Sequence, residues 1–198
     1  MKMNLSSITE TVHFIIRNNF KDEGNLLSCS SNSNLVMVDC TAGSGNDTIF
    51  LSEIGGLYGK VYAFDIQDEA INRVRAKIDR LNIENVVLIC DSHERLDQYI
   101  EGQIDCAVFN LGYLPGSDRS ITTRPDSTIR ALESVLSKIK KEGLVTVVSY
   151  STHPGGELEY IKLNEYLVGL NEKYFKVTRI GHLNSTKPGP VLFVIQKT

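Results

Sequence analysis

The sequence has no long apolar run, few cysteines and no excess of basic residues, and each absence narrows its function. No run approaches the roughly 18 apolar residues of a membrane span. Residues 1–14 lack the apolar core and small-residue cleavage site of a signal peptide. The four cysteines are Cys29, Cys40, Cys90 and Cys106, and none of them forms a C-x-x-C pair. We therefore expect a cytoplasmic protein with reduced thiols and no membrane partner.

The charge balance excludes a broad electrostatic attraction to nucleic acid. The chain carries 21 basic and 24 acidic residues, a formal net charge of −3. An RNA substrate would therefore have to be held by a local basic patch. The histidines show no metal-ligand spacing with acids or cysteines, so we expect no metal site.

Strand and helix signals alternate along the chain from residue 35 onward. Strands are expected at 35–39, 60–65, 85–91, 104–110 and 143–150, followed by an antiparallel pair at 174–183 and 190–197. Helices are expected at 11–20, 47–55, 69–82, 93–100, 126–140 and 157–170, with caps at Ser7, Asp68 and Asp126. Residues 21–34 are expected to form a flexible loop. The alternation predicts an α/β fold in one domain over residues 1–198, with a mostly parallel seven-stranded sheet and helices on both faces.

Polar side chains end most of the predicted strands. Asp39, Asp65, Asp91, Asn110 and Tyr150 each stand at the end of one. In a parallel sheet these ends share one edge, and ligands bind beyond that edge. We therefore expect a ligand site there.

The segment DCTAGSGNDT (39–48) follows the first strand and opens a helix. Gly43 and Gly45 allow a sharp turn and a close approach of the backbone to a ligand. Asp65 ends the second strand, 20 residues after Gly45, where an acid binds the ribose hydroxyls of an adenosine cofactor. The alternative is a tight strand-to-helix turn with a solvated aspartate.

Two residues favour S-adenosylmethionine over a nicotinamide cofactor. Thr48 stands where the dinucleotide fingerprint has its third glycine. Asp39, before the turn, suits a ligand that carries an ammonium group. The turn at 91–93 is expected to contact adenine, and it can also cap a helix. Cofactor contacts are expected from Asp39, Gly43, Ser44, Gly45, Asn46, Asp65, Gln67, Asp91, Ser92, His93 and Asn110.

The segment NLGYLP (110–115) resembles the Asn-Pro-Pro-Tyr element of amino-methylating enzymes. The amide oxygen of Asn110 and a neighbouring backbone carbonyl can accept the hydrogens of an amine and hold it in line for attack. Tyr113 can stack on a base, although a locally packed aromatic in a Gly-Pro loop is the alternative. Asp47, Tyr113 and His153 are candidates for hydrogen bonding or proton removal, whereas His13 is expected to have a plain amphipathic role.

Together, these motifs resemble the rRNA methylase family, which includes tRNA 5-(aminomethyl)-2-thiouridine methyltransferase. The segments that carry the resemblance are DCTAGSGNDT, FDIQ (64–67), DSH (91–93), NLGYLPGSDRSITTRP (110–125) and YSTHPGG (150–156). The family's glycine loop is nearer to G-N-G-H-D, so Ser44 and Asn46 depart from it.

The resemblance implies a Rossmann-like class I fold that uses S-adenosylmethionine to methylate the exocyclic amine of a wobble uridine in tRNA. Arg119, Arg124 and Tyr113 would then contact the anticodon loop. We also allow for a homodimer, which the sequence alone does not establish. Without the resemblance, the residues indicate an amine or nucleobase methyltransferase and no more specific substrate. The alternatives are a methyltransferase for ribosomal RNA, protein or a small metabolite, a nicotinamide-dependent reductase, and a non-catalytic RNA-binding module.

Overall fold

The computed structural model describes residues 6–20, 34–114, 116, 118, 121–153, 155–186 and 188–198. Within them the chain runs α1 (Ile8–Asn19), β1 (Val36–Asp39), α2 (Asn46–Gly55), β2 (Lys60–Asp65), α3 (Asp68–Leu81), β3 (Val86–Cys90) and the 3-10 helix η1 (His93–Gln98). It continues through β4 (Ile104–Asn110), α4 (Pro125–Lys138), β5 (Ile139–Ser149), α5 (Gly156–Val168), β6 (Phe175–Ile180) and β7 (Val191–Lys197). The alternation of strand and helix is confirmed. The loop expected at 21–34 lies outside the described residues, except for Asn34.

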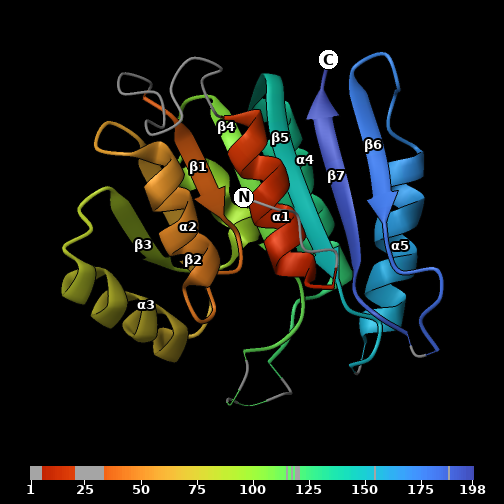
Figure 1. Ribbon diagram of the computed structural model, residues 1–198, viewed down its shortest axis with the longest axis horizontal. Helices are drawn as coiled ribbons and strands as arrows, with labels where there is room; N and C mark the ends of the chain where they lie inside the picture. Colours follow the sequence, from red (N-terminus) through yellow and green to blue (C-terminus); the bar gives the residue numbers. More distant parts are fainter. Residues whose placement is uncertain are drawn as a thin grey trace.

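The seven strands form one sheet in the order β3-β2-β1-β4-β5-β7-β6. Strand β7 pairs antiparallel with both β5 and β6, whereas the other pairs are parallel (Figure 1). The predicted mostly parallel sheet and its antiparallel closing pair are confirmed. The reversed strand is β7, and β6 forms the edge of the sheet.

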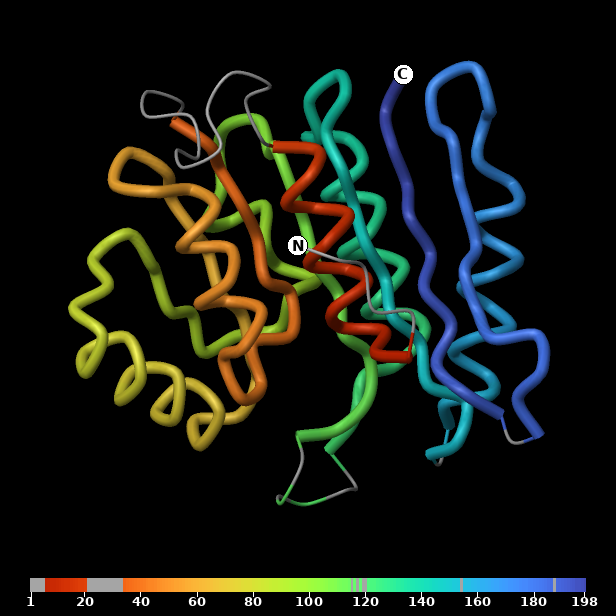
Figure 2. The backbone as a smooth tube through the Cα atoms, in the orientation of Figure 1, coloured from red at the N-terminus to blue at the C-terminus, as the bar shows by residue number. Residues whose placement is uncertain are grey.

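Helices cover both faces of the sheet, and the core lies in two layers. Ile16 of α1, Leu51 of α2 and Val74 of α3 are buried on one face. Leu132 of α4 and Leu163 of α5 are buried on the other. Figure 2 shows α1 crossing one face of the sheet beside α2. No helix in the described part of the chain is long and apolar enough to cross a membrane.

Two of the expected helix caps are wrong. Helix α4 begins at Pro125 with Arg124 as its N-cap, so Asp126 lies in the first turn. Proline lacks an N–H and its fixed φ suits the first helical position. Helix α3 likewise begins at Asp68, after Gln67. Ser7 is confirmed as a cap, because its hydroxyl accepts a hydrogen bond from the Glu10 N–H at 3.3 Å.

Strand β5 starts earlier than the sequence predicts. Helix α4 ends at Lys138 and Ile139 already pairs with Ile104 of β4, whereas the prediction placed the strand start at residue 143. The register shifts between Ile104 and Cys106, and Glu142 takes a φ of 62°. This irregularity accommodates the polar residues 140–142 within the strand, although their sequence is typical of the end of a helix.

Candidate functional site

A cavity of about 1070 Å³ opens at the carboxyl ends of the parallel strands. Most of the site residues expected from the sequence line it, namely Gly43, Ser44, Asn46, Asp47, Asp65, Gln67, Asp91, Ser92, His93, Asn110, Tyr113, Arg124 and His153. Asp39 and Gly45 do not line it, and Arg119 lies outside the described residues. The fold therefore gathers the scattered motifs at one edge of the sheet.

The Asp65 carboxylate fixes the glycine turn against the end of β2. Its Oδ2 accepts a hydrogen bond from the Gly43 N–H at 2.9 Å, and its Oδ1 accepts one from the Gln67 N–H at 3.0 Å. Gly43 itself takes a φ of 48°, in the left-handed region. A carboxylate offers about four acceptor sites, so both oxygens can still accept hydrogen bonds from the hydroxyl groups of a ribose.

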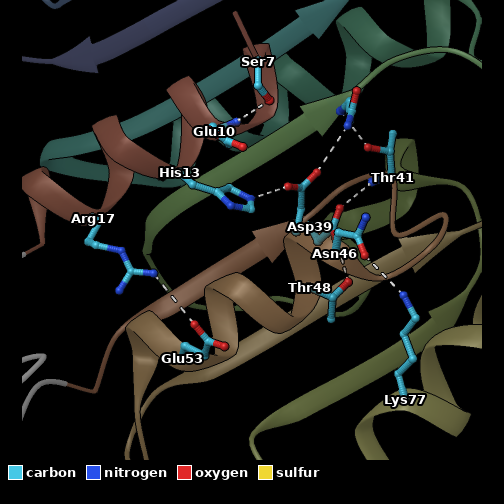
Figure 3. Close-up of polar contacts among 12 residues, drawn as sticks. Ser7, Glu10, His13, Arg17, Asp39, Thr41, Asn46, Thr48, Glu53 and Lys77 are labelled. Carbon is cyan, nitrogen blue, oxygen red and sulfur yellow. Dashed lines mark hydrogen bonds and ion pairs between the residues drawn. The ribbon is translucent and has the colours of Figure 1, made fainter. Parts of the chain in front are cut away.

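Gly45 serves the packing of the turn. It is the N-cap of α2 with a φ of 82°, and a Cβ here would lie 3.0 Å from Val74 Cγ2 of α3. Lys77 of α3 holds the same turn, because its Nζ donates to the Ser44 carbonyl at 2.6 Å. The same Nζ donates to Asn46 Oδ1 at 3.2 Å (Figure 3). Helix α3 thus holds the turn through Val74 and Lys77, while Ser44 and Asn46 still line the cavity.

Asp39 lies behind the cavity wall. Its side chain is fully buried, and its oxygens accept hydrogen bonds from the Thr48 hydroxyl at 2.6 Å and the Thr41 N–H at 3.1 Å. Burial, together with the negative charges of Asp47 and Asp65, raises the pKa of Asp39 to about 7, although the two hydrogen bonds oppose this. Thr48, which replaces a third glycine, is therefore the partner of this buried acid.

The turn after β3 both caps a helix and lines the cavity. The Ser92 hydroxyl accepts from the Glu94 N–H at 3.4 Å, at the start of η1. Burial alone would raise the pKa of Asp91, but hydrogen bonds from the Tyr99 hydroxyl and the Ser92 N–H, with the charge of Arg95, lower it. Asp91 is therefore ionised at neutral pH, and the two expected roles of this turn coexist.

His93 presents a buried acceptor to the cavity. Its Nδ1 lies 2.8 Å from the Cys40 carbonyl oxygen, and since a carbonyl only accepts, Nδ1 carries the proton. Burial lowers the pKa of His93, so the ring is neutral. Its Nε2 is buried and has no hydrogen-bond partner in the described structure. An unpaired buried acceptor suits a ligand with an N–H donor, such as an adenine amine.

Asn110 is fixed at the end of β4 by two contacts. Its backbone N–H donates to the Thr41 hydroxyl at 2.7 Å, and its Nδ2 donates to Asp47 Oδ2 at 3.3 Å. Because a carboxylate only accepts, the amide must turn its NH₂ toward Asp47, which leaves the carbonyl oxygen to accept from a substrate.

His13 contacts a residue of the cavity wall, which the sequence analysis did not predict. Its Nε2 lies 2.7 Å from Asp47 Oδ1, so α1 reaches the cavity wall through Asp47. The contact joins residues 34 apart in the sequence, and the pattern of an amphipathic helix does not signal it.

The loop after β4 is anchored to α5 by Glu159, a second residue that the sequence analysis missed. The Thr123 hydroxyl accepts from the Gly112 N–H at 3.0 Å and donates to Glu159 at 2.7 Å, and the Thr128 hydroxyl donates to Glu159 at 2.8 Å. Burial raises the pKa of Glu159 despite these hydrogen bonds. The anchor fixes the segment that carries Tyr113.

Tyr113 and His153 also line the cavity and contact each other. Tyr113 forms a β-bridge with Thr122, and its ring meets that of His153 edge-on, with centroids 6.1 Å apart. Arg124 lines the cavity nearby. Among the described residues, no group of three or more histidines, cysteines or acids could hold a metal ion.

The model of the family described as "Putative rRNA methylase" matches residues 61–196. The chain belongs to this family. A crystal structure from Clostridium thermocellum, a "putative rRNA-methylase", is 37% identical with a TM-score of 0.88, and the match covers 100% of this chain and 99% of that one. A "putative methyltransferase" from Streptococcus mutans, solved in complex with SAH, is 32% identical with a TM-score of 0.84, and the match covers 97% of this chain and 98% of that one.

A curated relative of this rRNA methylase family member is the chloroplastic tRNA (mnm5s2U34)-methyltransferase of Arabidopsis thaliana. It is 35% identical over 139 aligned residues. The match covers 64% of this chain and 51% of the relative, so it spans about half of that protein's length. Family, fold and neighbours together make the chain an S-adenosylmethionine-dependent methyltransferase with a Rossmann-like class I fold. The residues in the cavity fit this cofactor, because the Asp65 carboxylate lines it beside the glycine turn and His93 offers an unpaired acceptor.

Proposed function

We propose that this enzyme methylates the exocyclic amine of 5-aminomethyl-2-thiouridine at the wobble position of tRNA. The observation that carries the proposal is the fixed amide of Asn110, whose NH₂ group is held by Asp47 at the cavity edge. The name of the Arabidopsis thaliana relative supports the choice of substrate.

The cofactor would lie in the half of the cavity next to the glycine turn. Asp65 would accept hydrogen bonds from ribose, and His93, with Asp91 and Ser92, would contact adenine. S-adenosylmethionine supplies a methyl group that its sulfonium already activates, so the protein mainly has to position the amine.

Asn110 would orient the amine. Its carbonyl oxygen and a nearby backbone carbonyl would accept the two amine hydrogens, which aims the nitrogen lone pair at the methyl carbon. The nitrogen–carbon bond forms as the carbon–sulfur bond breaks, and the electron pair of that bond stays on sulfur. The product is a secondary ammonium ion with one more methyl group, and it becomes the neutral amine when it releases one proton to solvent.

The amine must also reach the site without its extra proton. An alkyl amine has a pKa near ~10.4, so its neutral form costs about 4–5 kcal/mol at pH 7. A cavity wall of mixed polarity and a neighbouring carboxylate can offset this cost. We propose Asp47, which contacts the Asn110 amide, as the proton acceptor, with Tyr113 and His153 as hydrogen-bonding partners of the uridine base.

The other half of the cavity would receive the uridine. A cavity of about 1070 Å³ reaches the upper limit of ~1,000 Å³ for single-ligand pockets, so it has room for a cofactor and a base together. Anticodon-loop bases can be splayed out of a single strand and stacked on an aromatic ring. Tyr113 would stack on the base, and Arg124 would contact phosphate.

The test is nucleoside mass spectrometry of tRNA that carries 5-aminomethyl-2-thiouridine, before and after incubation with the enzyme and donor. We expect one added methyl group at the wobble uridine, and none on an unmodified transcript of the same tRNA. Ribosomal RNA is the second arm, because the family is named for it. Methylation of ribosomal RNA alone would reject the proposal.

Asn110→Ala tests the role of the amide in the same assay. We expect turnover to fall about 100-fold or more, since a misplaced nucleophile can cost this much, while cofactor affinity changes little. Near-normal turnover in this variant would show that Asn110 does not orient the amine.

A further inference from the structure

We propose that His13 is a positioning residue for methyl transfer: from α1 it holds the Asp47 carboxylate, which in turn orients the Asn110 amide. The kinetic part of this inference rests on the proposed function. The geometric part does not, because it concerns contacts that exist before any substrate binds.

The three side chains form a continuous chain of hydrogen bonds across three elements. His13 Nε2 lies 2.7 Å from one oxygen of Asp47, and Asn110 Nδ2 lies 3.3 Å from the other. Since an ionised carboxylate only accepts, both neighbours must donate to it. The carboxylate is therefore held from two sides, and its rotation would move both contacts together.

The short contact from His13 is the one that can fix the carboxylate. A bond of 2.7 Å is in the range of charge-assisted hydrogen bonds, whereas 3.3 Å is long for an amide donor. Asp47 is mostly buried, with 8% of its surface exposed, so few waters can replace a lost donor. Without His13 the carboxylate would lack its stronger partner, and the weaker Asn110 contact would have to hold it alone.

The His13 ring is itself held in place. It stacks on Phe50 of α2, with centroids 3.8 Å apart and an angle of 8° between the planes. Phe50 is buried and packs against α1 and the sheet. Asp47 and Asn110 line the cavity and His13 does not, so His13 acts on the substrate only through Asp47.

Two substitutions separate the hydrogen bond from the ring. His13→Phe keeps an aromatic ring on Phe50 but has no donor, and His13→Gln keeps an N–H donor but has no ring. We expect His13→Phe to lower kcat about tenfold, the lower end for a hydrogen bond to a charged group, with KM and S-adenosylmethionine affinity nearly unchanged. His13→Gln should recover most of that loss.

A merely structural role of His13 predicts the opposite order. In that case His13→Phe would behave like the wild type and His13→Gln would lose stability, which would overturn the inference. Equal kcat in both variants and the wild type would overturn it as well. If His13→Phe does not fold, His13→Leu, which also lacks a donor, takes its place.

The second measurement needs no substrate. The side-chain amide of Asn110 can be followed by NMR in the free enzyme, with Asn110→Ser identifying its signal. We expect the signal to shift in His13→Phe and to stay near its wild-type position in His13→Gln. An unmoved signal in His13→Phe would overturn the inference even if methyl transfer to tRNA is confirmed, and a failed tRNA assay would leave this result standing.

Discussion

At the scale of single residues, Asp39 and Asp65 end neighbouring strands in opposite surroundings. Asp39 is fully buried behind Thr41 and Thr48, whereas Asp65 is partly exposed in the cavity. From the sequence we expect both to contact the cofactor, Asp39 at an ammonium group and Asp65 at the ribose hydroxyls. Their surroundings differ because of the segment that follows Asp39. Its Thr41 N–H donates to Asp39, and its Gly43 N–H, further along, donates to Asp65.

Asp65→Ala should weaken S-adenosylmethionine binding about ten- to a hundredfold, since a hydrogen bond to a charged group contributes ~1.5–3 kcal/mol. Isothermal titration calorimetry measures the affinity directly. Asp68→Ala is the matched control, because Asp68 is exposed, does not line the cavity and lies three residues further along. Equal affinities of Asp65→Ala and the wild type would remove Asp65 from the cofactor site.

Asp39 should make the protein less stable as the pH rises from about 4 to about 7. Its pKa is about 7 in the folded state and near ~3.9 in the unfolded chain, so in this window the folded state binds more protons. Stability therefore falls with rising pH, by up to roughly 4 kcal/mol for this group. Thermal unfolding across this pH range gives the slope.

Asp39→Asn should flatten that dependence and raise the melting temperature at pH 7. An asparagine can accept from the Thr41 N–H and donate to the Thr48 hydroxyl, so both hydrogen bonds can persist. An unchanged slope in this variant would mean that Asp39 is ionised throughout the range.

At the scale of elements, the sequence predicts the sheet well because buried strands read as apolar runs. Successive side chains of the strand at 104–110 point to opposite faces of the sheet. Val108 lies in one core layer and Phe109 in the other. The contacts that build the substrate half of the cavity are different. Glu159 meets Thr123 and Thr128 across more than 30 residues, and no local pattern marks an acid as buried.

The first residue of a helix depends on several neighbouring residues together and not on the best capping residue alone. Asp126 is a good cap by type, but Pro125 before it takes the first helical position and moves the cap to Arg124. His13 is similar, since a histidine on an amphipathic helix has no signature of its own until α1 packs against α2. The sequence therefore predicts the site residues that stand at strand ends. It does not predict the contacts that residues of packed helices make with them.

The anchor between the Tyr113 loop and α5 can be tested through Glu159. Glu159→Ala leaves the buried Thr128 hydroxyl and the partly buried Thr123 hydroxyl without their acceptor, which costs about 1–3 kcal/mol for the buried group. We expect a lower melting temperature and a raised KM for tRNA, because the segment carrying Tyr113 loses its hold. Glu157→Ala, an exposed acid two residues earlier on α5, should change neither. A normal KM for Glu159→Ala would limit its role to stability.

At the scale of the whole molecule, the net charge of −3 means that the protein repels RNA at long range. Binding of an anticodon loop must then depend on a few basic groups placed near the cavity. Arg124, at the cavity and at the N-terminus of α4, is such a group. Loss of a positive charge there should matter more than the same loss elsewhere on the surface.

Arg124→Ala and Arg75→Ala make this comparison, because each lowers the net charge from −3 to −4. Arg75 is exposed on α3 and does not line the cavity. We expect Arg124→Ala to reduce the slope of log K for tRNA against log salt concentration by about 0.7, the value for one single-strand phosphate contact. Arg75→Ala should leave the slope unchanged. Equal slopes for the two variants would mean that net charge, and no local contact at Arg124, governs the encounter with RNA.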